Sequence, residues 1–230
     1  MNPQLNSGTL QSYFNDASIL KFVKDNVKDL HGKVLDIGCG KMRYKDLILS
    51  GKNVKSYEGL DLEEGKFTYA VKADLYWDGI TIPLENNSID SVVVFEVLEH
   101  CPDPRIVINE AFRVLKPNGV MLFSTPFLYH LHGSPFDYAR LTPFGAKNML
   151  KEAGFADIEI GSGGRWDASL GQMISIWICN RPMPHPIRRI LSRLYAPVFR
   201  LLLSVDRKYA KLPMKDGTMI PNILGKAYKK

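Results

Sequence analysis

The chain has 230 residues, of which 45% are hydrophobic and 23% charged, and its formal net charge is +6. This composition excludes a disordered polypeptide and supplies enough apolar side chains for one sizeable core. The opening residues contain no basic start and no apolar run, and no uninterrupted apolar segment of about 18 residues occurs anywhere, so the sequence predicts a cytoplasmic protein that does not span a membrane.

Helical and extended patterns alternate along the first two thirds of the chain. Apolar side chains spaced as one helix face lie within residues 17–30, and residues 104–116 are also predicted to be helical. Residues 142–155 predict a helix with Thr142 as its cap, Pro143 in its first turn and Gly154 at its end. Strands alternating with helices predict a parallel sheet. The strand patterns cover residues 33–38, 57–63, 70–76, 89–97 and 120–126.

The segment "VLDIGCGKMRY", residues 34–44, begins as a buried strand and ends as a glycine-rich turn. A dinucleotide-binding fingerprint, G-x-G-x-x-G, needs glycine at position 43, where this chain has Arg43. Asp36, at the end of the strand, repels a pyrophosphate but suits a ligand that carries an ammonium group. S-adenosylmethionine carries an ammonium and a sulfonium, and Gly38 and Gly40 let the backbone approach it closely.

Several motifs in order resemble the class I S-adenosylmethionine-dependent methyltransferases over residues 17–160. "VLDIGCG" is similar to the first motif of that family, "GLDLE" to its ribose-binding acid, "KADLY" to its adenine loop and "RVLKPNGVMLFSTP" to the segment that ends in its fifth strand. The resemblance implies S-adenosylmethionine as cofactor. The cofactor-binding residues that we predict on this basis are Asp36, Gly38, Gly40, Asp61, Leu62, Asp74, Leu75 and Glu96.

The turn departs from the family pattern at Met42, where many members have a third glycine. A methionine there narrows the turn and bears on the pose of the cofactor. It also leaves open a second interpretation, in which the chain keeps the fold but acts as a noncatalytic binding or scaffold protein.

The segment "FEVLEHCPDP", residues 95–104, also resembles the ubiquinone-type O-methyltransferases. Glu96, Glu99 and His100 follow the fourth strand, where ligands of open α/β sheets bind, so they can act as acid and base groups or hold a divalent cation. We predict no metal here, because helix capping or contact with the edge of the cofactor explains the pattern more simply. His100 stays a candidate catalytic residue.

The loop "PFLYHLHGSPFDYARLTPFG", residues 126–145, concentrates ionisable and aromatic side chains after the fifth strand. We predict that it forms the wall of the acceptor site, and it resembles a signature, H-x-x-P-x-D-Y-x-R-x-T-P, of methyltransferases in bacterial polysaccharide and lipid-linked pathways. His132 can act as a base toward an acceptor hydroxyl, and Asp137 can orient it or pair with Arg140. The predicted acceptor-binding residues are His130, Tyr138 and Arg140.

Basic residues concentrate at the end of the chain. Residues 181–230 hold 12 Lys and Arg against 2 Asp and Glu, a balance of +10, whereas the remainder has a balance of −4. Residues 187–208 combine arginines with apolar residues at helical spacing, with a kink expected at Pro197. Two interpretations stay open: the helix binds an anionic membrane surface, or its apolar face packs on the protein's own core or on a second subunit.

These patterns predict an α/β, Rossmann-like fold: a seven-stranded, mostly parallel sheet with helices on both faces and a helical insertion before the last strand. The predicted divisions are a methyltransferase core at residues 1–165, an amphipathic basic insertion at residues 166–215 and a last strand within residues 216–230. The predicted function is S-adenosylmethionine-dependent O-methylation of a small, sugar or lipid-linked acceptor by a cytoplasmic protein, and peripheral attachment to the inner face of the membrane is one of the two open interpretations of the basic helix. RNA methylation is the less favoured alternative, because an N/D-P-P-Y-type amine motif does not follow the fourth strand.

Overall fold

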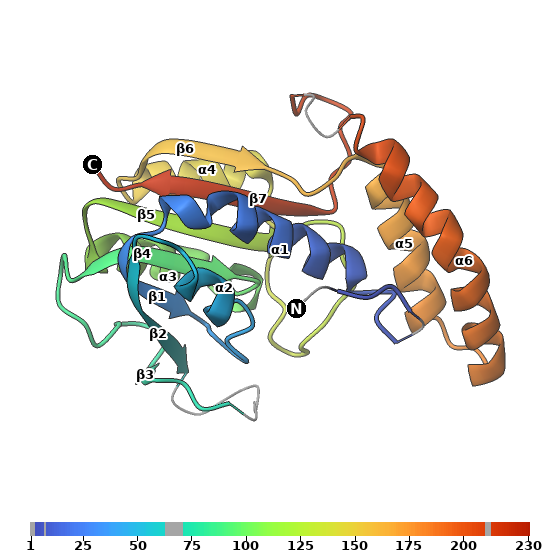
Figure 1. Cartoon of the computed structure of the whole chain (residues 1–230), viewed down its shortest axis with the longest axis horizontal. Coiled ribbons are helices and arrows are strands. Elements are labelled where there is room, and N and C mark those ends of the chain that lie inside the picture. Colours follow the sequence, from blue (N-terminus) through green and yellow to red (C-terminus); the bar gives the residue numbers. More distant parts are fainter. Residues whose placement is uncertain (1–2, 7, 63–70, 210–212) are drawn as a thin grey trace.

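The computed structural model describes residues 3–6, 8–62, 71–209 and 213–230. A seven-stranded sheet in the order β3-β2-β1-β4-β5-β7-β6 forms its centre, with helices on both faces (Figure 1). The elements are α1 (Tyr13–Asn26), a 3-10 turn (Val27–Asp29), β1 (Gly32–Ile37), α2 (Lys45–Leu49), β2 (Val54–Leu62), β3 (Leu75–Trp77), β4 (Ile89–Phe95), a second 3-10 turn (Leu98–His100), α3 (Pro104–Val114), β5 (Leu115–Pro126), α4 (Pro143–Glu152), β6 (Ala156–Gly161), α5 (Trp166–Asn180), α6 (His185–Asp206) and β7 (Asn222–Tyr228).

The pairing of the strands confirms the predicted fold class. Strands β1 to β5 pair in parallel, and β7 runs antiparallel between β5 and β6. The last strand therefore lies within the predicted segment of residues 216–230, and the two helices α5 and α6 precede it as the predicted insertion.

Alternating side chains of the central strands build two cores. In β4, Val92 belongs to a cluster that includes Val107 of α3, whereas its neighbour Val93 belongs to a cluster that includes Ile19 of α1. Both valines are fully buried. A strand that is covered on both faces must be apolar on both, which is why β4 reads as a continuous apolar run in the sequence.

Two capped helices fix the ends of the loops around the site. The side chain of Asp103 accepts a hydrogen bond from the Arg105 amide at the start of α3 (3.0 Å), and Thr142 accepts one from the Gly145 amide at the start of α4 (3.0 Å). Each helix has proline in its first turn, where the missing amide hydrogen costs nothing.

Helices α5 and α6 form a hairpin beyond one end of the sheet (Figure 1). Their packing is close, because a Cβ on Gly171 would lie 2.5 Å from the ring of Phe199, and the Tyr195 hydroxyl donates to the Gly171 carbonyl (3.0 Å). Asp206, at the end of α6, accepts hydrogen bonds from the amides of Arg165 and Ala168 at the start of α5. The helix α6 continues unbroken through Pro197.

The carboxyl ends of the parallel strands meet at one edge of the sheet. Gly38 follows β1, Asp61 lies near the end of β2, Glu96 follows β4, and the loop of residues 127–142 follows β5. Ligands of open α/β sheets bind at this edge, so the topology brings together the residues that the sequence analysis singled out.

Candidate functional site

A cavity of about 810 Å³ opens at this edge. Asp61 and Leu62 of β2 line one side, and His100 and His132 line the other. The cavity therefore joins two predicted cofactor-binding residues to two predicted catalytic residues. Its remaining described lining residues are Ile37, Gly38, Trp77, Asp78, Gly79, Ile80, Glu96, Val97, Cys101, Pro102, Asp103, Ile106, Val107 and Gly133.

The glycine turn after β1 is held open toward this cavity. Gly38 and Gly40 have φ angles of +69° and +49°, which glycine adopts without strain. A Cβ at Gly38 would lie 2.5 Å from Val97 Cγ2, so a larger residue would fill the space in front of the turn. The Gly40 amide donates to Asp61 Oδ2 (3.0 Å), which ties the turn to the end of β2.

Met42 adopts a left-handed backbone conformation, with φ of +49°. Its side chain is 8% exposed and packs in the core cluster with Cys39, and its Cε lies 2.6 Å from the place that a Cβ on Gly59 would occupy. Met42 does not appear among the described residues that line the cavities at this edge. Its side chain therefore turns toward the core, which removes the reason for the scaffold interpretation.

A second cavity of about 330 Å³ lies on the other side of the turn and shares Gly38 and Glu96 with the first. Asp36 lines it, is 5% exposed and accepts a hydrogen bond from the Tyr57 hydroxyl. Burial raises the pKa of Asp36 to about 7, although the Tyr57 hydrogen bond works against that rise. A cationic group beside Asp36 would favour its ionised form.

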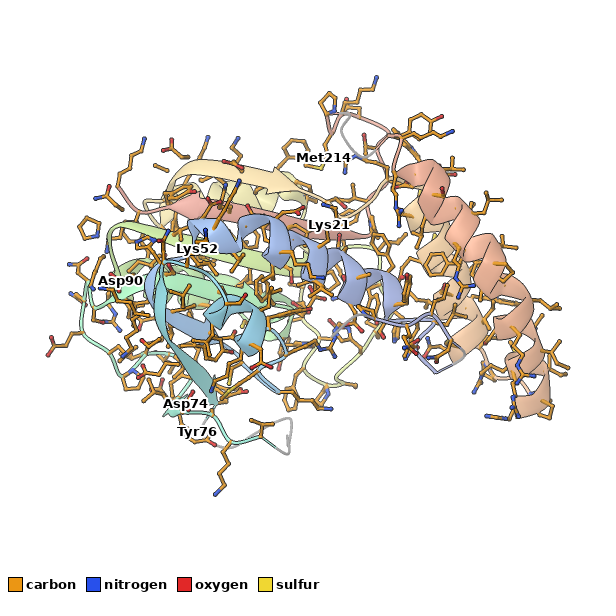
Figure 2. The ribbon with its side chains drawn as sticks, in the orientation of Figure 1. Lys21, Lys52, Asp74, Tyr76, Asp90 and Met214 are labelled. Atoms are coloured by element: carbon orange, nitrogen blue, oxygen red, sulfur yellow. The ribbon has the colours of Figure 1, made fainter. Side chains whose placement is uncertain are left out.

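The residues predicted to face adenine lie outside the described lining of the first cavity. Asp74 accepts a hydrogen bond from the Gly59 amide (2.8 Å) and lies 4.0 Å from Lys45 Nζ, at the edge strand β3 where Figure 2 labels it beside Tyr76. Neither Asp74 nor Leu75 is among the described lining residues, so their predicted contact with adenine stays a prediction. Residues 77–80, which run from the last residue of β3 into the following turn, are a part of the cavity wall that was not identified from the sequence.

Glu96 lies between the two cavities with an unusual backbone conformation, φ +56°. Its carboxylate accepts hydrogen bonds from Ser124 Oγ (2.7 Å) and from the side-chain amide of Asn15. Burial, followed by the neighbouring charge of Glu99, raises the pKa of Glu96. The side chain is thus fixed where the two cavities meet.

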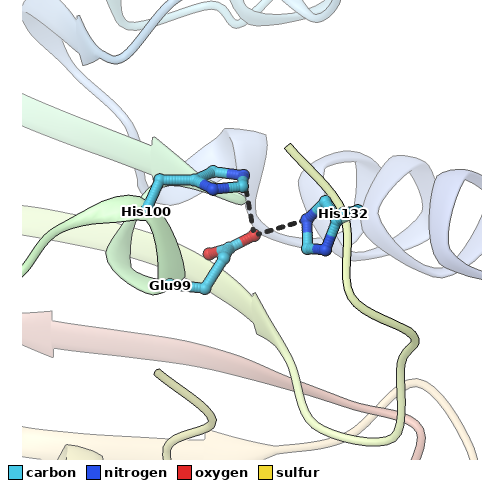
Figure 3. A group of neighbouring side chains, drawn as sticks. All are labelled: Glu99, His100 and His132. Carbon is cyan, nitrogen blue, oxygen red and sulfur yellow. Dashed lines mark ion pairs between the residues drawn. The ribbon is translucent and has the colours of Figure 1, made fainter. Parts of the chain in front are cut away.

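A buried carboxylate lies between two imidazoles at the end of the acceptor side (Figure 3). Glu99 Oε1 is 3.8 Å from Nε2 of His100 and 3.8 Å from Nε2 of His132. Glu99 is 0% exposed, and this burial raises its pKa. The three side chains offer ligand atoms that all lie within 4.8 Å of one another. Among the described residues, they form the group that could hold a metal ion.

The acceptor loop is braced by an ion pair beneath His132. Asp137 accepts the backbone hydrogen bond of His132 (3.0 Å) and a two-pronged hydrogen bond from Arg140, at 2.5 and 2.8 Å. The Arg140 guanidinium holds the pKa of Asp137 at about 2. Arg140 also donates to the His130 carbonyl (3.1 Å). Both predicted alternatives for Asp137 hold together: it orients His132 and it pairs with Arg140.

Two other residues of the loop lie apart from the cavity lining. The Tyr138 side chain is 47% exposed, while its amide donates to the Glu99 carbonyl (2.8 Å). The His130 ring lies against Tyr129, with ring centroids 4.4 Å apart, and burial lowers its pKa. The predicted contacts of Tyr138, His130 and Arg140 with an acceptor remain predictions.

The groups around the two cavities fit S-adenosylmethionine. The first cavity offers Leu62, Ile80 and Val97 as apolar contacts for adenine and Asp61 as an acceptor for ribose hydroxyls. The second offers Asp36 to an ammonium group. The turn at Gly38, which a Cβ would fill, lies between them. A nucleoside joined to a cationic amino acid matches this order of groups.

Comparisons with known proteins agree with this geometry. A family profile described as "Methyltransferase domain" matches residues 10–160. The chain is 33% identical over 135 residues to a probable S-adenosylmethionine-dependent methyltransferase of Mycolicibacterium smegmatis. The aligned region covers 53% of this chain and 51% of that protein. It is 31% identical over 139 residues to a ubiquinone biosynthesis O-methyltransferase of Neisseria meningitidis serogroup C, covering 55% and 56%. The chain spans about half the length of the curated relatives it matches.

Solved structures share the fold over nearly the whole chain. A SAM-dependent methyltransferase from Archaeoglobus fulgidus superposes with a TM-score of 0.57 at 16% identity, covering 95% of this chain and 97% of that one. The [4+2]-cyclase SpnF gives a TM-score of 0.54 at 18% identity, covering 94% and 81%. A cyclase on the same fold means that reaction chemistry must be argued from the residues of the site.

Proposed function

The chain belongs to the methyltransferase-domain family, with S-adenosylmethionine as cofactor, and we propose that it transfers the methyl group to a hydroxyl of a small, sugar or lipid-linked acceptor. One observation carries this proposal: Asp61, the predicted ribose acceptor, and His132, the predicted base, line the same cavity. A donor held by Asp61 and an acceptor beside His132 would therefore share one enclosed space.

The bound cofactor supplies an electrophilic methyl group on a sulfonium, and the protein supplies position and a route for a proton. Asp61 and the Gly38 turn would hold the donor, and the acceptor loop would hold the acceptor hydroxyl facing it. The acceptor oxygen would give up its proton as it takes up the methyl group. The proton passes to the group of Glu99, His100 and His132.

The arrangement of that group supports the proton transfer. His132 is oriented by Asp137 through its backbone amide, and Glu99 faces both imidazoles from a buried position. His100 is held in turn, because its Nδ1 lies 2.6 Å from the Phe136 carbonyl. Amines need less help from a base than hydroxyls do, so a site with this many proton acceptors favours oxygen as the methylated atom.

Transfer of labelled methyl groups tests the proposal. The protein is incubated with methyl-labelled cofactor and a panel of hydroxyl acceptors, including sugar and lipid-linked alcohols, and His132→Ala is assayed beside the parent. We expect label on a hydroxyl acceptor with the parent and strongly reduced label with the variant. Label that appears only on amines, or equally with both proteins, would overturn the proposal.

The hairpin surface supports a lipid-linked acceptor. One face of α6, to the side of the residues that pack on α5, is apolar yet exposed, and α5 carries exposed apolar residues as well. The predicted stripe is therefore divided: Tyr195 packs on α5, whereas Leu194 is 66% exposed. The exposed apolar residues are Leu170, Met173 and Trp177 of α5 and Ile187, Ile190, Leu194, Val198 and Leu201 of α6.

The positive charge along α6 favours an anionic partner for this surface. Helix α6 carries three exposed arginines, Arg189, Arg193 and Arg200. Its one acidic residue, Asp206, is buried and accepts hydrogen bonds from backbone amides at the start of α5. A helix with an apolar stripe and flanking arginines binds an anionic lipid surface by apolar burial and electrostatic attraction. We therefore propose an anionic membrane as the partner of residues 187–208, with the protein peripheral on the inner face.

Attachment at the interface is distinct from insertion. Among the described residues, the helices lack any segment that is both long enough and apolar enough to cross a bilayer. Docking through α6 would keep the core in water while bringing lipid-linked acceptors to the site.

A further inference from the structure

Three side chains below the acceptor cavity face one another around a buried carboxylate. Glu99 Oε1 lies 3.8 Å from Nε2 of His100 and from Nε2 of His132, too far for a hydrogen bond to either. Figure 3 shows the carboxylate directed at both rings. Glu99 and His100 come from the turn after β4, and His132 comes from the loop after β5.

The carboxylate oxygen at the centre lacks a hydrogen-bond donor in the described part of the chain. Glu99 is 0% exposed, and its Oε1 accepts no hydrogen bond from the described residues, whereas Oε2 accepts one from Thr125 Oγ1 (3.4 Å). Buried carboxylate oxygens are normally paired, hydrogen-bonded or bound to metal, because burial removes their hydration. We therefore expect a further group at Oε1.

The outer nitrogens of the two rings indicate what fills this place. His100 Nδ1 lies 2.6 Å from the Phe136 carbonyl, which can only accept, so Nδ1 carries the hydrogen and the neutral ring presents a lone pair at Nε2. His132 Nδ1 lies 3.3 Å from the His130 carbonyl and 3.4 Å from Asp137 Oδ2, which directs its Nε2 in the same way. Metal-binding histidines are oriented by such carbonyl and carboxylate partners.

We propose that Glu99, His100 and His132 bind a divalent transition-metal ion such as Zn²⁺. The two imidazoles and one carboxylate suit Zn²⁺ and similar ions better than Mg²⁺ or Ca²⁺, which prefer oxygen. Bonds of about 2.0 to 2.2 Å place two ligand atoms of one ion about 3.0 to 3.5 Å apart, so the two 3.8 Å separations from Glu99 need to close by a few tenths of an ångström. The widest separation in the group, which is at most 4.8 Å, needs to close further.

The position of the ion gives it a role that rests on the proposed function. His100 and His132 line the acceptor cavity, so the open coordination position faces the acceptor. An acceptor hydroxyl bound there loses its proton more readily, and the proton passes to water in the cavity. His132 is then a ligand of the ion and the ion takes over its task as base. The proposed metal site differs from the expectation from sequence. That expectation was that no metal binds, and it considered Glu96, Glu99 and His100 as possible ligands without His132.

Metal binding is measured on the full chain without donor or acceptor. Chelator-treated protein is titrated with Co²⁺, followed by its visible absorption, and with Zn²⁺, followed by calorimetry. We expect one ion per chain at this site and affinity at least 100-fold weaker in His132→Ala and in Glu99→Gln, while His185→Ala, a histidine on α6, binds as the parent does. Thermal melts check that each variant is folded.

The outcomes separate this proposal from the proposed function. Absence of saturable Co²⁺ or Zn²⁺ binding to the parent, or affinity that survives in both folded variants, overturns the metal site. Full methyl transfer by chelator-treated protein also overturns it and leaves the proposed function standing. One bound ion that depends on Glu99 and His132, in a protein that methylates no hydroxyl, supports the metal site and refutes the proposed function.

Discussion

Asp137 holds His132 by two contacts: its Oδ2 accepts the His132 backbone hydrogen bond at 3.0 Å and lies 3.4 Å from Nδ1 of the same residue. A single carboxylate thus fixes both the loop and the orientation of the ring. Because Arg140 binds the same carboxylate through two hydrogen bonds, the support is rigid. Loss of the His132 side chain should therefore affect the reaction without affecting the donor side of the cavity.

His132→Ala is expected to lower turnover by about 100-fold or more while affinity for S-adenosylmethionine stays unchanged. The reason is that the side chain serves proton removal from the acceptor and does not contribute to the Gly38 turn. Turnover and calorimetric cofactor binding are measured on the same preparation, with His185→Ala as the matched control. Near-parent turnover would make His132 structural.

Asp61→Ala is expected to lose most of the cofactor affinity. The variant removes the acceptor for two ribose hydroxyls, each charge-assisted hydrogen bond being worth about 1.5 to 3 kcal/mol, and it also frees the Gly40 amide. Calorimetric titration with S-adenosylmethionine measures the loss. Asp46→Ala, an exposed carboxylate on α2, is the control and should bind normally. If Asp61→Ala binds as tightly as Asp46→Ala, the assigned site is wrong.

Asp36 should make the cofactor-free protein less stable at alkaline pH. Its pKa is raised from 3.8 to about 7 in the folded chain, mainly by burial. The folded state therefore holds a proton that the unfolded state has released, and the free energy of unfolding falls as pH rises from about 4 to about 7.

Asp36→Asn removes this titration, which thermal or urea unfolding at two pH values detects. Relative to the parent, the variant should gain up to about 3 kcal/mol of stability between pH 5 and pH 8. In the variant the hydrogen bond with Tyr57 does not change with pH, so the pH-dependent part of the difference reports the ionisation of Asp36 together with its own hydrogen bond from Tyr57. An equal stability difference at pH 5 and pH 8 would show that Asp36 does not titrate in this range.

Flotation with vesicles tests the hairpin. The parent is expected to float with anionic phosphatidylglycerol vesicles at low salt and less with neutral phosphatidylcholine, since the arginines attract anionic headgroups. The double variant Arg193→Ala and Arg200→Ala should bind about 30-fold more weakly, whereas Lys52→Ala with Lys55→Ala, an equal charge change on the core, should bind as the parent does. Equal binding to both vesicles, or a stable dimer that buries the hairpin, contradicts the membrane proposal.

The positions of site residues that are close together in the sequence, or that lie on successive strands, could be predicted from sequence. Asp36 lies near the end of a strand, Gly38 and Gly40 form the turn after it, and Asp61 lies near the end of the following strand, so the local pattern and the family resemblance place them together. The last strand was predicted within residues 216–230, and β7 lies there. Short-range patterns carry this information.

Relationships across the fold could not be predicted. The sequence pointed to Asp74 as the adenine neighbour, a contact that stays a prediction, and it gave no sign that Trp77, at the end of β3, and Asp78 after it line the cavity. The meeting of Glu99 with His132 depends on how two loops pack. The stripe on α6 was visible in sequence, but its division between a buried and an exposed face depends on α5.

Whether this chain is a hydroxyl methyltransferase is decided by transfer of a labelled methyl group from S-adenosylmethionine to a panel that contains sugar and lipid-linked alcohols, amines and RNA. We expect label in an alcohol acceptor, bound as an ether, and its loss in both Asp61→Ala and His132→Ala. Label found in RNA or an amine, or retained in both variants, would contradict the proposed donor and acceptor sites.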